Sequence, residues 1–177
     1  MRLPFRDRSF GHLGLSLALI TLLSLSSGCG LQLRGGLAVP ERLQSLYLQG
    51  DERSPIFQTV ERSFESSGVT LVNSAAQAPY QINLIRAQHQ RRSASLNENA
   101  KTQEYELRAQ LSYSIEDNSG AILVKPTEIY TERTYGYDED HVNAKEAEEE
   151  LLLQEMRENL ARQLVRRYLK LAEINSR

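Results

Sequence analysis

The feature that most constrains the fold is a strict alternation of apolar and polar residues over residues 105–115. The apolar positions are Tyr105, Leu107, Ala109, Leu111, Tyr113 and Ile115. The polar positions between them are Glu106, Arg108, Gln110, Ser112 and Ser114. Successive side chains of a β-strand point to opposite faces of a sheet, so this segment predicts a strand with one buried face. Its other face meets water or a polar partner.

A helical period over residues 143–172 predicts the layer that covers the buried face. An i, i+4 series of large apolar side chains comprises Leu152, Met156, Leu160, Leu164 and Tyr168. The stripe is widened by Ala144, Ala147, Leu151, Val165 and Leu169. Such a stripe is wide enough to cover a sheet. Acidic residues crowd the start of the segment and basic residues its end, which suits the helix dipole.

A shorter helix is predicted after Ser54. Ser54 is suited to cap it, and Pro55 is suited to its first position, where a missing N–H costs nothing. The apolar residues Ile56, Phe57, Val60 and Phe64 fall on one face. Gly68 is placed to end the helix in a left-handed conformation.

Three more predicted strands complete the sheet. One covers residues 46–48, one begins at Tyr80, and one runs over residues 122–137 after a turn at residues 117–120. Pro126 favours an edge position or a bulge for the last of these. The order strand, helix, three strands, helix predicts an α+β fold. We expect a two-layer sandwich with two helices packed on one face of a four-stranded, mostly antiparallel sheet.

Cys29, the only cysteine, lies where a signal peptide would end. Three arginines precede an apolar run over residues 13–25, which is shorter than the about 20 residues that a membrane-spanning helix needs. The run, the small residues Ser27 and Gly28, and Cys29 resemble a bacterial lipobox, although Ser26 stands where the commonest lipobox has leucine. The resemblance implies cleavage before Cys29 and acylation of its thiol. The alternative is a structural cysteine beside a signal peptide.

These features predict the domain organisation. We expect a signal peptide over residues 1–28, a lipidated tether over residues 29–41, and a single α+β domain over residues 42–177. The net charge of the whole chain is −2, and three arginines but only one acidic residue leave with the signal peptide. The mature chain is therefore more acidic, which argues against a nucleic-acid binder. Gly30 in place of aspartate implies, by resemblance, sorting to the outer membrane.

Enzymatic chemistry finds little support in the sequence. The chain has three histidines, one of them in the signal peptide, and it lacks a Gly-x-Ser-x-Gly elbow. His141 follows Asp138, Glu139 and Asp140, but this spacing matches no standard metal site, and a solvated helix start explains it better. We expect no catalytic residue, no metal and no cofactor.

Residues 86–103 form a basic segment in an otherwise acidic chain. Arg86, Arg91, Arg92 and Lys101 stand against Glu98 alone. We expect this segment to link two strands as a basic hairpin tip. Guanidinium groups bind phosphates in bidentate fashion, so the tip could contact phosphorylated glycolipids. The alternative, a solvated loop whose charges contact nothing, stays open.

The sequence of residues 29–35, CGLQLRG, resembles the start of mature lipoproteins of the LptE lipopolysaccharide-assembly family, with Leu31 where the family has an aromatic residue. Further similarities lie in Glu104-Tyr105-Glu106-Leu107, Asn143-Ala144-Lys145, Glu155-Met156-Arg157 and Ala161-Arg162-Gln163-Leu164. The resemblance covers essentially the whole mature chain in the same order of elements.

The resemblance implies a non-enzymatic plug that sits inside the outer-membrane β-barrel LptD, helps it to assemble and contacts lipopolysaccharide. It implies an outer-membrane protein, lipid-anchored on the periplasmic side. Within the family-like Asn-Ala-Lys motif, Lys145 is implied to bind lipopolysaccharide, and the charge argument adds Arg91, Arg92 and Lys101. The alternative is a free outer-membrane lipoprotein that acts as a binding scaffold for peptidoglycan or another envelope protein.

Overall fold

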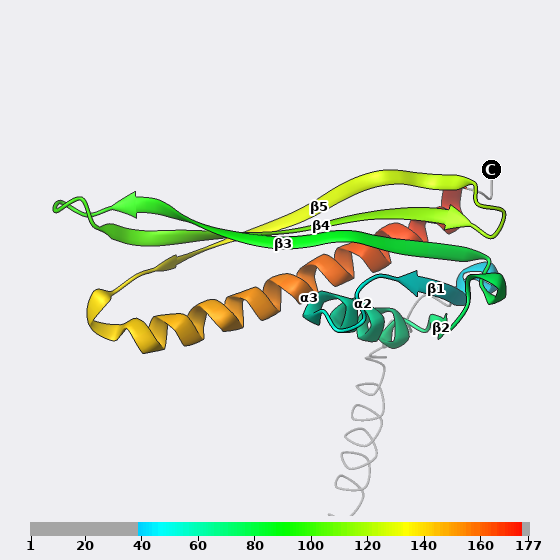
Figure 1. Ribbon diagram of the computed structural model, residues 1–177, viewed down its shortest axis with the longest axis horizontal. Coiled ribbons are helices and arrows are strands. Elements are labelled where there is room, and N and C mark those ends of the chain that lie inside the picture. Colours follow the sequence, from blue (N-terminus) through cyan, green and yellow to red (C-terminus); the bar gives the residue numbers. More distant parts are fainter. Residues whose placement is uncertain (1–38, 175–177) are drawn as a thin grey trace, which may run out of the picture. The chain divides into compact units, whose positions relative to one another are not determined.

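The computed structural model describes residues 39–174, in which one sheet carries two α-helices on the same side (Figure 1). The β-strands are β1 (Ser45–Gln49), β2 (Thr70–Val72), β3 (Tyr80–Leu96), β4 (Thr102–Asp117) and β5 (Ile122–Gly136). The α-helices are α2 (Pro55–Ser66) and α3 (Val142–Ile174). Short 3-10 helices are η2 (Glu41–Leu43), η3 (Ala75–Gln77) and η4 (Glu139–His141). The predicted α+β class is confirmed. Cys29, the predicted signal peptide and most of the predicted tether lie outside the described residues.

The sheet has five strands in the order β2-β1-β3-β4-β5, so the prediction of four strands was wrong. β1 pairs in parallel with both β2 and β3, whereas β3, β4 and β5 are antiparallel. The missed strand, β2, has only three residues, too few for an alternation to be recognised. Its formation depends on pairing with β1, in which Ser45 lies opposite Thr70.

β5 occupies the edge of the sheet, as Pro126 indicated. The register between β4 and β5 shifts in the region of this proline, because Tyr113 lies opposite Thr127 whereas Ile115 lies opposite Val124. A proline has no N–H to donate to a ladder, so an edge position with an irregular register accommodates it.

β3 is much longer than the sequence indicated. It continues to Leu96 and pairs with β4 up to the pair Leu96 and Thr102, so the interpretation of residues 86–103 as a connecting segment was wrong. The sequence does not predict this part of β3, because its residues are mostly polar on both faces and lack the alternation of apolar and polar residues seen in β4. Only residues 97–101 form the turn.

Both ends of α2 follow the predicted chemistry. The Ser54 hydroxyl accepts a hydrogen bond from the backbone N–H of Phe57 at 3.3 Å, and Pro55 is the first helical residue. After the helix, Gly68 adopts φ +83°. This left-handed residue lets the N–H of Val69 donate to the Phe64 carbonyl at 3.1 Å, and the chain turns directly into β2.

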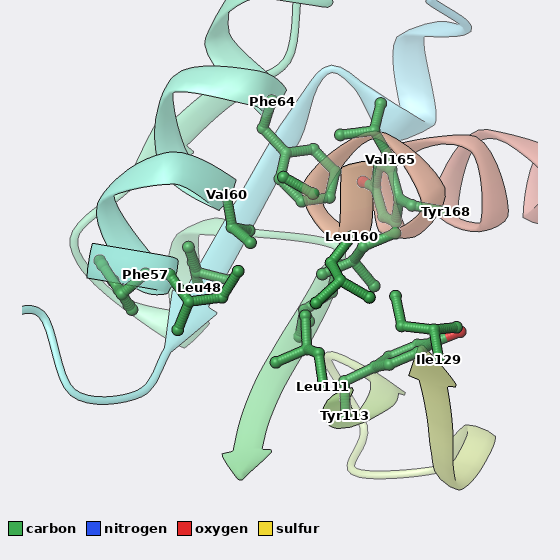
Figure 2. Close-up of a cluster of buried hydrophobic side chains, with 14 of the residues drawn as sticks. Leu48, Phe57, Val60, Phe64, Leu111, Tyr113, Ile129, Leu160, Val165 and Tyr168 are labelled. Atoms are coloured by element: carbon green, nitrogen blue, oxygen red, sulfur yellow. The ribbon is translucent and has the colours of Figure 1, made fainter. Parts of the chain in front are cut away.

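The core lies between the sheet and the two helices (Figure 2). The apolar face of β4 is buried there, with Leu107 and Leu111 both fully inaccessible. From α3, Met156, Leu164 and Tyr168 are equally inaccessible. The alternation in β4 and the helical stripe of α3 therefore meet as predicted.

The predicted stripe of α3 was wrong at its first turns. Leu151 is 58% exposed, and Ala144 and Ala147 are also exposed. The helix face that meets the sheet carries Glu149, Leu153 and Met156. Residues 147 and 151 each lie two residues from Glu149, which is about half a helical turn, so they point away from the sheet. The first turns of α3 therefore meet the sheet through polar contacts. No helix within residues 39–174 is long and apolar enough to cross a membrane.

Candidate functional site

The candidate site is the end of the sheet where β3 and β4 form their hairpin, beside the start of α3 (Figure 1). The turn is held by the Asn97 side chain, whose Oδ1 accepts hydrogen bonds from the N–H groups of Asn99 and Lys101, both at 3.0 Å. The Lys101 ammonium then reaches Glu139 in η4 at 2.6 Å. This ion pair ties the hairpin tip to the segment that leads into α3.

Arg91 lies on the inner face of β3 and contacts α3. Its Nη1 donates to Glu149 at 2.8 Å, and its guanidinium lies 4.7 Å from the centre of the Tyr105 ring. The Tyr135 hydroxyl of β5 donates to the same Glu149 carboxylate at 2.5 Å. We call Arg91, Tyr135 and Glu149 the polar clamp. It joins β3, β5 and the start of α3.

The polar clamp shifts the ionisation of its members. Burial and the hydrogen bond to Glu149 raise the pKa of Tyr135 to about 12. Burial alone would raise the pKa of Glu149, but the hydrogen bonds from Tyr135 and Arg91 outweigh it and lower that pKa from its ordinary value. Glu149 is therefore ionised and Tyr135 neutral at neutral pH. The Glu149 carboxylate therefore accepts hydrogen bonds from one cation, Arg91, and from one neutral donor, Tyr135.

Arg92 points to the opposite face of the sheet, because successive residues of a strand alternate. It donates to Glu106 at 2.7 Å. Two further contacts lie along this outer face: Arg108 pairs with Glu132 at 3.1 Å, and its guanidinium carbon lies 4.2 Å from the centre of the Tyr130 ring. We call this surface of β3, β4 and β5 the polar outer face. It is charged but largely self-neutralised.

Lys145 belongs to the first turns of α3. Its ammonium pairs with Glu148 at 2.8 Å, and its side chain is 25% exposed. An i, i+3 pair of this kind is a local feature of the helix surface and contributes little to stability.

The structure does not gather the four predicted basic residues into one cluster. Arg91 and Arg92 lie on opposite faces of β3, Lys101 at the hairpin tip, and Lys145 on α3. Each has a carboxylate oxygen within 2.8 Å of a side-chain nitrogen. These four bases therefore contact acidic partners, and a phosphate would compete with those carboxylates.

Sequence reasoning missed the acidic and aromatic partners of these bases. Glu149 belongs to a run of acidic residues whose members look alike in the sequence, and only the direction of α3 selects it to face the sheet. Tyr105 and Tyr135 did give a signal, since both fall on the inward positions of their strands. Their rings lie 5.9 Å apart, next to Arg91.

Within residues 39–174, no group of three or more histidine, cysteine or acidic side chains is arranged to hold a metal ion. His141 pairs with Asp138, with 2.9 Å between Nδ1 and the carboxylate. Asp138 also accepts a hydrogen bond from the N–H of Asp140 and thereby caps η4. This acidic cluster has a structural explanation.

Comparison with known sequences gives consistent matches. A family described as LptE, lipopolysaccharide-assembly, matches residues 43–168. An LPS-assembly lipoprotein LptE from Pectobacterium atrosepticum is 32% identical over 82% of this chain and 79% of its own length. A protein of the same name from Yersinia enterocolitica is 32% identical over 89% of this chain and 76% of its own length.

Solved structures agree. Lipoprotein B from Nitrosomonas europaea superposes with a TM-score of 0.70 at 25% identity, over 81% of this chain and 93% of that one. The rare lipoprotein B from Shewanella oneidensis gives a TM-score of 0.64 at 26% identity, over 74% of this chain and 97% of that one. The arrangement of elements described above is thus shared with other bacterial lipoproteins.

Proposed function

The chain belongs to the LptE family of lipopolysaccharide-assembly lipoproteins, and from that premise we propose that it plugs an LptD-type outer-membrane β-barrel, helps that barrel to assemble, and contacts lipopolysaccharide on its way to the cell surface. We propose that acylation of Cys29 anchors it on the periplasmic side of the outer membrane. The family acts in lipopolysaccharide assembly, so the proposal contains no catalytic step.

The polar outer face is the observation that best supports the proposed role as a plug. The lumen of a wide outer-membrane barrel is polar, so a plug has to present polar groups whose hydrogen bonds are satisfied. On this face Arg92 pairs with Glu106, Arg108 with Glu132, and Gln88 with Gln110 at 2.6 Å. The charged side chains of these pairs therefore have partners before any contact with a wall, and the Nε of Arg108 is the one buried side-chain polar atom within residues 39–174 that lacks a hydrogen-bond partner.

Co-purification tests the plug. Tagged, full-length protein expressed with its barrel should be isolated in detergent as a stable one-to-one complex. A monodisperse lipoprotein that never retains a barrel would refute the proposal and favour the alternative, a free scaffold for peptidoglycan or another envelope protein. Recovery of peptidoglycan fragments with the tagged protein would identify that alternative directly.

The contact with lipopolysaccharide is proposed for the basic residues of the candidate site, with Lys145 and Arg91 as its main members and Arg92 and Lys101 beside them. Exposed ion pairs are worth about 0–1 kcal/mol, so a lipid phosphate can displace Glu139 from Lys101 at little cost, because both side chains of that pair are more than half exposed. The side chains of Arg91 and Lys101 are 47% and 58% exposed.

Neutralising variants test this contact. Lys145→Gln combined with Arg91→Gln should weaken binding of lipopolysaccharide severalfold and leave the circular-dichroism spectrum unchanged. Lys125→Gln is the control for the loss of one positive charge, to be compared with each single variant as well, because Lys125 is an exposed base of β5 outside the candidate site. Equal binding by the double variant and the control would refute the assignment.

A further inference from the structure

An apolar groove lies on the inner side of the sheet, beside the start of α2. Its volume is about 230 Å³. Its floor consists of Ala87 from β3 and Ala109 from β4, and its apolar walls are Pro55, Ile56, Leu153 and Leu160. An apolar cavity of about 150 Å³ is enough to bind benzene, so this space suits a hydrocarbon chain. It is too small for a helix, whose diameter with side chains is about 10–12 Å.

The groove exists because two alanines occupy inward positions of adjacent strands. Ala87 lies opposite Leu111, which is fully buried, yet Ala87 itself is exposed. An exposed alanine on the face that elsewhere forms the core shows that neither helix covers the sheet at this point. Larger side chains at Ala87 and Ala109 would fill the space.

A cation lies beyond the groove on the same face of β3. His89 lines the groove and follows Ala87 by two residues, and Arg91, outside the lining, follows two residues later. At about 3.4 Å per residue, Arg91 lies roughly 14 Å along the strand from Ala87. Arg157 of α3 also lines the groove and pairs with the exposed Glu150 at 3.0 Å.

Arg91 has capacity for a further ligand. It donates to Glu149 through Nη1, and a guanidinium carries five N–H donors. The groove therefore has an apolar floor and Arg157 in its wall, and Arg91 lies beyond the groove on the same face of β3. This pattern is complementary to an anionic amphiphile whose phosphate lies roughly 14 Å from the bound part of its hydrocarbon chain.

We propose that this groove takes up one acyl chain of the lipid A part of lipopolysaccharide, with a phosphate of the same molecule at Arg91. The proposal rests on the proposed function, since it assumes the contact with lipopolysaccharide. It adds that recognition is bipartite: the cations bind the phosphate, and the alanine floor selects for an acylated ligand. Loss of the acyl chain should then weaken binding as much as loss of the groove.

Filling the groove tests the proposal. Ala87→Leu places a larger side chain on the exposed floor, and Ala109→Val is a second, smaller filling. Ala147→Leu is the control, because it makes the same change on the exposed side of α3. Each full-length variant is titrated with purified lipid A and with lipid A stripped of its ester-linked acyl chains. We expect both fillings to weaken binding of intact lipid A about tenfold or more, to the level that the wild type shows for the stripped form, and the control to bind normally.

The outcomes separate this proposal from the proposed function. Lipid A binding that is insensitive to both fillings but sensitive to Lys145→Gln would overturn the groove and leave the contact with lipopolysaccharide intact. A wild type that binds no lipid A at all would overturn both. Fillings that weaken only the complex with the barrel would show that the groove holds a side chain of the barrel, which also overturns the proposal.

Discussion

Removal of the carboxylate at the centre of the polar clamp gives the sharpest test of how α3 is attached to the sheet. In Glu149→Ala, Arg91 and Tyr135 lose the acceptor that they share. Tyr135 is 5% exposed, so its hydroxyl would lose its charged acceptor, with little water to replace it and only the Arg91 guanidinium nearby. Arg91 is 47% exposed and can be rehydrated.

The expected loss follows from these burials. An unsatisfied buried hydroxyl costs about 1–3 kcal/mol, and a half-exposed ion pair contributes about 0–1 kcal/mol. We therefore expect Glu149→Ala to lower the free energy of unfolding by about 2 kcal/mol. For a chain of this size this corresponds to a decrease in Tm of about 4–8 °C. Glu149→Gln keeps an acceptor for Tyr135 and should lose less than half as much.

The clamp also predicts a pH dependence. The folded-state pKa of Glu149 lies below its ordinary value of 4.5, so its stabilisation is present above that value and is lost as the pH falls through the lower, folded-state pKa. Urea unfolding between pH 7 and pH 3 should show wild type and Glu149→Gln converging in stability at the acid end. At neutral pH, amide hydrogen exchange in the first turns of α3 should be faster in Glu149→Ala than in the wild type.

Glu146→Ala is the control, since Glu146 is exposed in the same part of α3 and its replacement has the same effect on helix propensity. The reasoning is refuted if Glu149→Ala and Glu146→Ala unfold at the same urea concentration. It is also refuted if the stability difference between wild type and Glu149→Gln stays constant down to pH 3.

Two further predictions concern the cap of α2 and the lipid anchor. Gly68→Ala should lower the free energy of unfolding by about 1–2 kcal/mol, because Gly68 has φ +83° and a side chain there strains the backbone. Gly136→Ala, which has open space around it and no positive φ, should be neutral in the same urea titration. Mass spectrometry of the mature N-terminal peptide should find Cys29 acylated, and an unmodified thiol there would contradict the proposed anchor.

The sequence predicted those parts of the fold in which local pattern and tertiary packing agree. The alternation in β4 and the cap and proline at the start of α2 are local signals, and both are confirmed. β2 and the far half of β3 were missed because their strands depend on neighbours: one is too short to show a period, and the other is polar on both faces.

The candidate site was predictable only in its residue types. A count of charges indicated a basic segment, but not that Arg91 and Arg92 point to opposite faces or that each already has a carboxylate partner. Those partners lie on other elements: Glu149 is 58 residues from Arg91 along the chain. The apolar groove could not be predicted from the sequence, because Ala87 and Ala109 are far apart along the chain and become neighbours only when β3 pairs with β4.

The β3–β4 hairpin extends past the apolar core as an antiparallel ladder of strands of 17 and 16 residues, with register shifts between Leu84 and Arg86 and around Ser95. At about 3.4 Å per residue each strand spans more than 50 Å. One end of the hairpin is packed in the core, and the end that carries the turn lies outside it. Two ion pairs join this end of the hairpin to other elements: Lys101 with Glu139 near the turn, and Arg91 with Glu149 at the edge of the core, where Arg91 lies opposite the buried Leu107. Loss of both ion pairs would leave the first turns of α3 attached to the sheet mainly through the hydrogen bond from Tyr135 to Glu149, whereas the ladder between β3 and β4 would be unchanged. A ligand that competes for these two cations would therefore loosen the helix rather than the hairpin.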